Sequence, residues 1–167
     1  YIFEKILCVI KSLHTINILH QDIKPDNILL NIDADENIIN VFLVDFGNSV
    51  YVEDFTVPEV LTSSSGLPLY TDLERLRNDI CDGRSDMYSL GITFLKCFNI
   101  TRFENLVLDG ISNTNPNLLT FICSNEEFLQ LLITESLRAF FKNKDKRLKR
   151  ITRMIFDCMS DSRSHAY

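Results

Sequence analysis

Apolar residues recur at intervals of three and four from the start of the chain, at Ile2, Phe3, Ile6, Leu7, Ile10 and Leu13. This spacing places them on one face of a helix and predicts an amphipathic helix that packs against a core. No Ser, Thr, Asp or Asn precedes this stretch to cap the free N–H groups of the first turn. We therefore expect the helix to begin without its usual capping residue.

The next apolar stretches are short and predict strands. We expect residues 17–19 to be extended, residues 27–30 to form a short buried strand, and residues 41–44 to form a second, apolar strand. Pro25 excludes a helix interior between them, so the polar residues 20–27 lie on a loop between packed elements. Such loops often carry catalytic groups. Asp45 and Gly47 follow the second strand, an arrangement suited to holding a carboxylate at a metal ion.

The second half of the chain predicts helices. Ser124 and Glu127 form a capping-box pattern before an apolar helical face over residues 128–141, and another apolar face runs over residues 151–158. The Asn-rich residues 105–120 predict a surface loop. Residues 63–66 predict a mobile segment inside one fold and not a domain boundary.

Composition limits the class of protein. A chain of 167 residues with 46% hydrophobic content and a net charge of −6 fits one domain with a substantial core. Five cysteines, an odd number without a CxxC pair, argue against a disulfide framework or a zinc site, and we expect buried thiols. No apolar run reaches the roughly 18 residues of a membrane span. We expect no membrane association and a location in the cytoplasm or nucleus.

Four motifs in order resemble the C-terminal, large lobe of a eukaryotic protein kinase. HQDIKPDN at residues 20–27 is similar to the family's catalytic loop, His-Arg-Asp followed by Asn five residues after the Asp. Residues 45–47 read DFG, residues 66–74 resemble the end of the activation segment, and residues 84–91 resemble the start of the buried helix after it. The resemblance implies a mainly α fold with a few short β-strands, which corresponds to the large lobe of the kinase fold without the N-terminal β-lobe. Residues 1–167 would then form a partial kinase domain.

The resemblance also implies ATP-dependent phosphorylation of serine or threonine in a protein substrate, with ATP and Mg²⁺. Asp22 would be the catalytic base and Lys24 would steady the transferred phosphate. Asn27 and Asp45 would hold Mg²⁺, and Leu29 would pack beneath the adenine ring, so that Leu29 and Asp45 contact the nucleotide. Structural roles would fall to His20, Phe46, Gly47, Glu74, Asp86 and Arg150. His20 and Phe46 would belong to the hydrophobic column between the lobes, and His20 would transfer no proton.

Three residues depart from the family pattern. Gln21 replaces the arginine that reads a phosphorylated activation loop, and Leu67 replaces a threonine that bonds to the catalytic aspartate and lysine. Leu73 replaces the proline before Glu74. Glu74 pairs either with Arg150 in a buried ion pair or with another group at the surface, and the sequence leaves both open.

No GxG occurs among the five glycines, so the chain contains no glycine-rich loop to cover phosphates, and no small-lobe lysine or glutamate accompanies it. We therefore expect a fragment of a longer kinase polypeptide that is inactive alone. The alternative is a non-catalytic single lobe that binds or inhibits another kinase. Its apolar groups at Leu29 and Phe46 would then need a partner's surface to cover them.

Other features give weaker indications. Asp45 follows Asp22 by 23 positions, and this long hairpin resembles the casein-kinase-one and vaccinia-related branch. Asp33 begins a partial calcium-loop pattern that lacks its turning glycine and closing glutamate, so an acidic hairpin tip is expected. Residues 138–153 hold eight basic residues against one acid. Because no RNA-binding motif accompanies them, a solvated link between helices is preferred over a nucleic-acid-binding surface.

Overall fold

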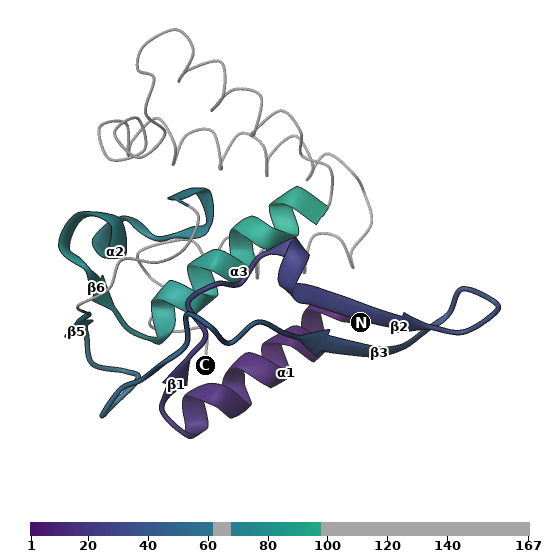
Figure 1. The fold of residues 1–167 in the computed structure, drawn as a ribbon, viewed down its shortest axis with the longest axis horizontal. Helices are drawn as coiled ribbons and strands as arrows, with labels where there is room; N and C mark the ends of the chain where they lie inside the picture. The colour runs from purple at the N-terminus through teal and green to yellow at the C-terminus, as the bar shows by residue number, and fades with distance from the viewer. Residues whose placement is uncertain (62–67, 98–167) are drawn as a thin grey trace, which may run out of the picture.

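The computed structural model describes residues 1–61 and 68–97. Its helices are α1 (Ile2–Thr15), α2 (Leu73–Asn78) and α3 (Gly83–Cys97), with two short 3₁₀ turns, η1 (Pro25–Asn27) and η2 (Pro68–Tyr70). Its strands are β1 (Ile18–Leu19), β2 (Ile28–Ile32), β3 (Ile38–Leu43), β4 (Val50–Tyr51), β5 (Glu59–Val60) and β6 (Ile80–Cys81). Within these ranges the strands form three two-stranded antiparallel sheets, β1–β4, β2–β3 and β5–β6, and no barrel (Figure 1).

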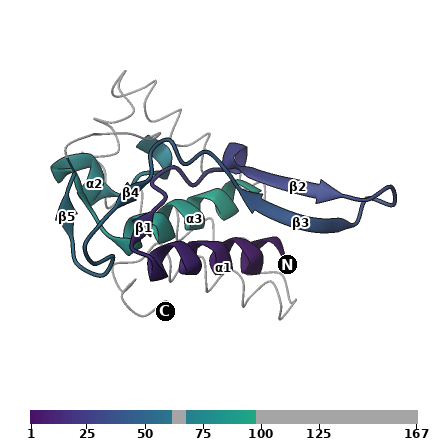
Figure 2. The same ribbon diagram turned by 60° about the horizontal axis from the view of Figure 1, so that its bottom comes forward.

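Helix α1 follows the prediction from its apolar spacing. It begins at Ile2, and no side chain caps its first turn. Ile6 and Ile10 are completely buried, and each such side chain contributes about 1.5–3 kcal/mol through its removal from water. The Phe3 ring meets Phe94 of α3 edge-on, with ring centroids 4.4 Å apart. Helices α1 and α3 therefore lie side by side and form the core beneath the loop at residues 20–27 (Figures 1 and 2).

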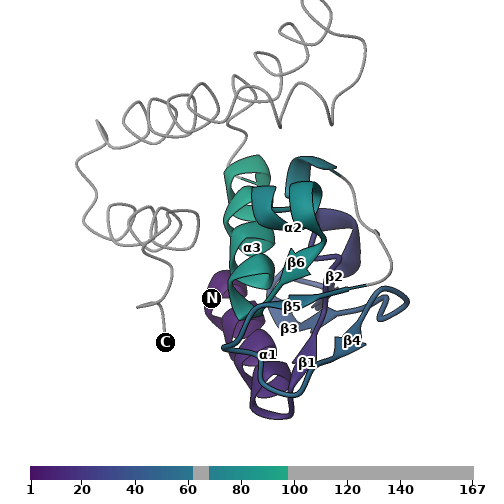
Figure 3. The same cartoon turned by 90° about the vertical axis from the view of Figure 1, so that its left-hand side faces the viewer.

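Helix α3, predicted to begin near Arg84, begins at Gly83 and is buried around most of its circumference. Met87, Leu90 and Ile92 are at most 2% exposed, and the polar Asp86, Ser89 and Thr93 are buried among them. Buried polar groups need hydrogen-bond partners, and these three bond to backbone groups of neighbouring segments. Figure 3 shows α3 at the centre, with α2 and the β5–β6 pair on one side of it and α1 below.

The β2–β3 hairpin, predicted from its two apolar runs, extends beyond the helices (Figure 2). Its register pairs Ile28 with Leu43 and Leu29 with Phe42. At the tip, the Asp33 carboxylate accepts bonds from the backbone N–H groups of residues 35 and 37, at 2.9 and 2.8 Å. The Asn37 amide, which donates to the same group, lowers the pKa of Asp33. The tip therefore satisfies its carboxylate with its own donors, as expected for an acidic turn.

Some expectations need correction. Pro25 opens the 3₁₀ turn η1, in the first-turn position where its missing N–H is not required. The two hairpin strands begin and end one to three residues from the predicted limits. The prediction of a buried strand over residues 27–30 is wrong, because Leu29 and Leu30 of β2 are 51% and 44% exposed on a hairpin that extends beyond the helices. The expectation of buried thiols is wrong for Cys8 and Cys97, which are exposed, whereas Cys81 is buried.

Several sequence predictions lie outside the described residues: the helices over 128–141 and 151–158, the loop over 105–120, the segment 63–66, the basic stretch 138–153, Leu67 and Arg150. In the described part of the chain, no helix combines the length and apolar character needed to cross a lipid bilayer.

Candidate active site

The polar residues 20–27 converge on the carboxylate of Asp22, which is 7% exposed. The Lys24 ammonium group donates to Asp22 Oδ2 at 2.7 Å, and the Asn27 amide donates to the same oxygen at 3.0 Å. Asn27 also donates to the backbone carbonyl of Asp22 at 2.7 Å. Both side-chain donors lie on Oδ2, so Oδ1 accepts no hydrogen bond from the residues that the structure describes. The carboxylate is held in one orientation with one oxygen available.

The backbone of this loop is fixed by Asp86 in the first turn of α3. Asp86 is completely buried, and it accepts from the N–H of His20 through Oδ2 and from the N–H of Gln21 through Oδ1, both at 2.8 Å. Gln21 has a φ of 64°, a left-handed conformation that ordinary residues rarely adopt. The bond from its N–H to a buried carboxylate is strong enough to offset this strain.

Gln21 occupies the position of the family arginine. Its side chain is 9% exposed, and the amide Nε2 has no hydrogen-bond partner in the described part of the chain. A neutral amide does not form the charged, bidentate pair that a guanidinium makes with phosphate. This position therefore offers a phosphorylated residue a neutral donor only.

His20 joins the loop to the residues after β3. Its Nδ1 accepts from the N–H of Asp22 at 3.3 Å, and its Nε2 lies 3.2 Å from the carbonyl of Val44. These partners fit a neutral ring that carries its proton on Nε2. Burial lowers the pKa of His20, although the Asp86 carboxylate opposes this effect. The ring also packs against Phe46, at 4.8 Å between centroids.

The residues predicted to hold Mg²⁺ lie close together. The N–H of Val44 donates to the carbonyl of Asn27 at 2.9 Å, and this bond brings Asn27 next to the turn at Asp45. Because the Asn27 Nδ2 group is engaged by Asp22, its Oδ1 remains a possible ligand. Asp45 is exposed, with a φ of 64°. Mg²⁺ in phosphoryl-transfer sites needs only one or two protein oxygens beside phosphate and water, so this donor set fits the ion.

No group of three or more His, Cys, Asp or Glu side chains in the described ranges could hold a metal ion by itself. Gly47 donates to Asp45 Oδ1 at 3.2 Å, and a Cβ at this glycine would lie 3.2 Å from the same oxygen. A side chain there would crowd the carboxylate.

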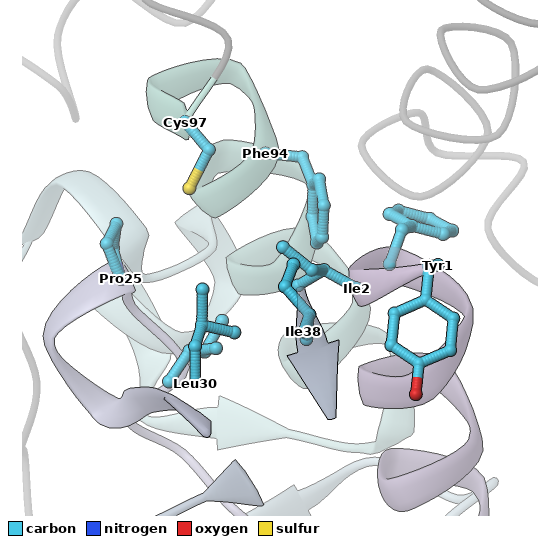
Figure 4. A pocket seen from close by; sticks show the side chains of 9 residues that line it. Tyr1, Ile2, Pro25, Leu30, Ile38, Phe94 and Cys97 are labelled. Atoms are coloured by element: carbon cyan, nitrogen blue, oxygen red, sulfur yellow. The ribbon is translucent and has the colours of Figure 1, made fainter. Parts of the chain in front are cut away.

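The predicted adenine-facing residue is on the open face of the hairpin. Leu29 is 51% exposed and Phe46 47% exposed. Because side chains alternate along a strand, Ile28 and Leu30 point to the opposite face. There they line an apolar cavity together with Ile38, Phe94 and other residues (Figure 4). Among the described residues that line this cavity none has a charged side chain, and the cavity lies on the face of the hairpin opposite to Leu29.

Two residues with a predicted structural role, Glu74 and Arg150, do not belong to the loop at residues 20–27. Glu74 lies in the first turn of α2 with a 57% exposed side chain, 3.5 Å from the Arg84 guanidinium. Arg150 is not among the described residues, so the pairing of Glu74 with Arg150 stays a prediction.

Sequence reasoning missed His14, whose Nε2 lies 2.9 Å from Asp86 Oδ2, with both side chains buried. A signal was present, because His14 follows Ile6 and Ile10 at four-residue intervals on the buried face of α1. It also missed Ser89 and Thr93, whose hydroxyl groups lie on the buried α3.

Comparisons with known proteins show the family of this chain. The family model described as protein kinase domain matches residues 1–164. The serine/threonine-protein kinase PknD of Chlamydia pneumoniae is 30% identical over 136 residues, which cover 69% of this chain and 14% of that protein. The DNA damage response protein kinase DUN1 of Saccharomyces cerevisiae is 33% identical over 110 residues, 58% of this chain and 21% of that protein.

The human serine/threonine-protein kinase ULK1 is 32% identical over 98 residues, 56% of this chain and 9% of that protein. The chain thus spans about a fifth or less of the length of these three relatives. Since the family model covers nearly the whole chain, and the loop around Asp22 has the geometry described above, the chain belongs to the protein kinase family.

Proposed function

We propose that this chain is the large-lobe part of a longer polypeptide that transfers a phosphoryl group from ATP to serine or threonine in a protein substrate. The observation that carries the proposal is the Asp22 carboxylate, which Lys24 and Asn27 orient through Oδ2 on a loop fixed by Asp86. Membership of the protein kinase family supports phosphoryl transfer, and the relatives above are serine/threonine kinases or a protein kinase by name.

Asp22 has the geometry of a base that accepts or orients the proton of a substrate hydroxyl. Its Oδ1, which accepts no hydrogen bond from the described residues, would be the acceptor, while the bonds to Oδ2 oppose rotation of the group. The hydrogen bond to Asp22 raises the pKa of Lys24, so this ammonium group stays charged at neutral pH. A fixed positive charge next to the base would steady the phosphate as it is transferred.

Asn27 and Asp45 would hold Mg²⁺ through Oδ1 of the amide and the carboxylate. When bound, the ion supplies neutralisation of phosphate charge. Leu29 would provide the apolar floor for the adenine ring, since its side chain is half exposed on the face of the hairpin away from the apolar cavity. The resemblance to the casein-kinase-one and vaccinia-related branch of the kinases stays a prediction.

The test uses the longest natural polypeptide that contains this chain, incubated with ATP, Mg²⁺ and peptides whose acceptor is serine, threonine or tyrosine. We expect serine or threonine to be phosphorylated, and Asp45→Ala to abolish transfer. Asp35→Ala, which removes an exposed carboxylate from the hairpin tip, is the matched control and should leave the rate unchanged. Transfer to tyrosine alone, or undiminished transfer by Asp45→Ala, would contradict the proposal.

A second candidate function rests on the exposed apolar surface of Leu29 and Phe42, which pair across the hairpin, and of Phe46; each side chain is about half exposed. A lone lobe could cover this surface by binding the small lobe of another kinase. Such a protein would form a stable one-to-one complex that survives Asp45→Ala and is lost in Phe42→Asp. A complex of this kind without phosphoryl transfer would favour the second function over the first.

A further inference from the structure

Asp45 lies on a short turn after β3, and its exposed carboxylate has few contacts of its own. Its φ of 64° is a left-handed conformation that costs free energy for a residue with a side chain. Among the described residues, its carboxylate accepts a hydrogen bond only from the N–H of Gly47, at 3.2 Å. A metal ligand has to be held in one place, so the contacts that fix this turn decide how well Asp45 can bind an ion.

The turn around Asp45 meets one residue of the catalytic loop, His20, at three points. Before Asp45, the carbonyl of Val44 lies 3.2 Å from Nε2 of His20. Directly after Asp45, the Phe46 ring packs against the imidazole, with 4.8 Å between centroids. At the end of the turn, the Ser49 hydroxyl donates to the backbone carbonyl of His20 at 3.2 Å. Asp45 is therefore enclosed by contacts with His20 on both sides.

The contact of Ser49 differs from the other two because it depends on one side-chain hydroxyl. The pairing of β1 with β4 begins next to Ser49 and ends next to His20, and includes neither residue. The N–H of His20 donates to the buried carboxylate in α3, and the N–H of Ser49 donates back to the carbonyl of Phe46 at 3.1 Å. With both N–H groups used in this way, the bond between the two residues is made by the Ser49 hydroxyl.

This hydroxyl acts on the turn and not on the reacting groups. The hydrogen bonds of Ser49 in the described part of the chain go to His20 and Phe46, and none reaches Asp22 or Lys24. Removal of the hydroxyl releases the end of the turn from His20, while the bonds that orient Asp22 stay in place.

Resting on the proposed function, we propose that Ser49 is a positioning residue for Mg²⁺, because its bond to His20 holds the turn that presents Asp45 to the ion. Loss of the hydroxyl should weaken the binding of a nucleotide that carries Mg²⁺. Binding of the same nucleotide without the metal should be unchanged, since Asp45 then has no ion to bind.

The experiment measures the affinity for ADP by isothermal titration calorimetry, once with Mg²⁺ and once with EDTA, in the longest natural polypeptide that contains this chain. Ser49→Ala removes the hydroxyl, and Ser49→Thr keeps it. Ser12→Ala is the matched control, because the Ser12 hydroxyl also donates to a backbone carbonyl, that of Cys8 at 3.0 Å, but does so on the exposed face of α1.

We expect Ser49→Ala to weaken ADP binding with Mg²⁺ about three- to fivefold. This is the lower part of the range for one hydrogen bond, because 3.2 Å is long for a hydroxyl donor. Its affinity for ADP in EDTA should equal that of the wild type. Ser49→Thr and Ser12→Ala should match the wild type under both conditions.

Hydrogen exchange gives a readout that needs no ligand. In Ser49→Ala, exchange should accelerate over residues 44–50 and stay unchanged in α3, and Ser12→Ala should show neither effect. An unchanged affinity of Ser49→Ala for ADP with Mg²⁺, an equal loss in EDTA, or failure of Ser49→Thr to restore binding would overturn the assignment. A wild-type polypeptide that binds no ADP would refute the proposed function. Unchanged exchange over residues 44–50 in Ser49→Ala would instead show that the hydroxyl does not hold the turn, and would overturn the inference whether or not ADP binds.

Discussion

The replacement of Asp86 by asparagine tests how the catalytic loop is held. The carboxylate accepts from the N–H groups of His20 and Gln21, and from Nε2 of His14, through its two oxygens. An asparagine keeps the shape but has one acceptor oxygen and one NH₂ group. In either orientation, one of the two backbone N–H groups then faces another donor.

The expected loss can be worked out from these bonds. A hydrogen bond to a charged group contributes about 1.5–3 kcal/mol, and its loss in a fully buried site leaves the N–H group without any partner. The bonds that remain become neutral, which weakens them by a further ~1 kcal/mol. We therefore expect Asp86→Asn to lower the free energy of unfolding by about 2.5–4 kcal/mol, a large fraction of the 5–15 kcal/mol of a typical domain.

The assay is equilibrium urea unfolding followed by far-ultraviolet circular dichroism. Asp82→Asn is the matched control, since Asp82 is also a buried carboxylate but bonds to Arg84 and not to the loop. Asparagine can keep the bond to the Arg84 N–H through its Oδ1 but loses the charge that pairs with the partly exposed Arg84 guanidinium, so the control should lose about 1–2 kcal/mol. The reasoning fails if Asp86→Asn is no less stable than Asp82→Asn.

Three further predictions follow from other buried groups. Burial lowers the pKa of His20 below its usual value of 6.5. Below pH 6.5 the unfolded chain therefore binds more protons than the folded one. The contribution of His20 to the free energy of unfolding should be full above pH 6.5 and should decrease as the pH falls toward the pKa of the folded state. His20→Asn should flatten this dependence in urea unfolding, and equal slopes in both proteins would contradict the assignment. Burial raises the pKa of Cys81 to about 12, whereas Cys8 is exposed. Iodoacetamide at about pH 8 should therefore label Cys8 and leave Cys81 unmodified in the native protein, as measured by peptide mass spectrometry. Equal labelling of the two cysteines would contradict this prediction. Asn27→Ala removes two bonds to the catalytic loop and should lower the free energy of unfolding by about 1–3 kcal/mol, whereas Asn40→Ala on the exposed hairpin should change it by less than about 0.5 kcal/mol. An indistinguishable pair of asparagine variants would show that the Asn27 bonds contribute little.

Much of the fold could be predicted because local rules and packing agree. The spacing of Ile6 and Ile10 marks the buried face of α1, and that face is buried against the core as predicted. The two apolar runs around residues 33–37 pair as a hairpin because the polar turn between them can satisfy its own backbone groups. The loop over residues 20–27 could be predicted because Pro25 and a cluster of polar groups lie between two apolar runs, whereas the roles of its residues come from the resemblance to protein kinases.

What the sequence could not give depends on long-range contacts. The bonds from Asp86 to His20 and Gln21 join residues more than sixty positions apart, and no local pattern fixes that distance. The hydroxyl of Ser89 likewise finds its acceptor only when η2 has packed on α3. The exposure of Cys8 was also missed, because a cysteine at the edge of an apolar face has the same local pattern whether or not another element covers it.

The most direct test of the account is the role of Asp22 compared with that of Asp26, four residues later in the same loop. Asp22 is buried and oriented by two donors, whereas Asp26 is exposed. In the longest natural polypeptide that contains this chain, we expect Asp22→Asn to reduce phosphoryl transfer from ATP to a serine or threonine peptide by at least about 100-fold, the scale of general-base catalysis. Asp26→Asn should remain close to the wild-type rate. Equal rates for the two variants would contradict the assignment of Asp22 as the catalytic base and, with it, the central claim.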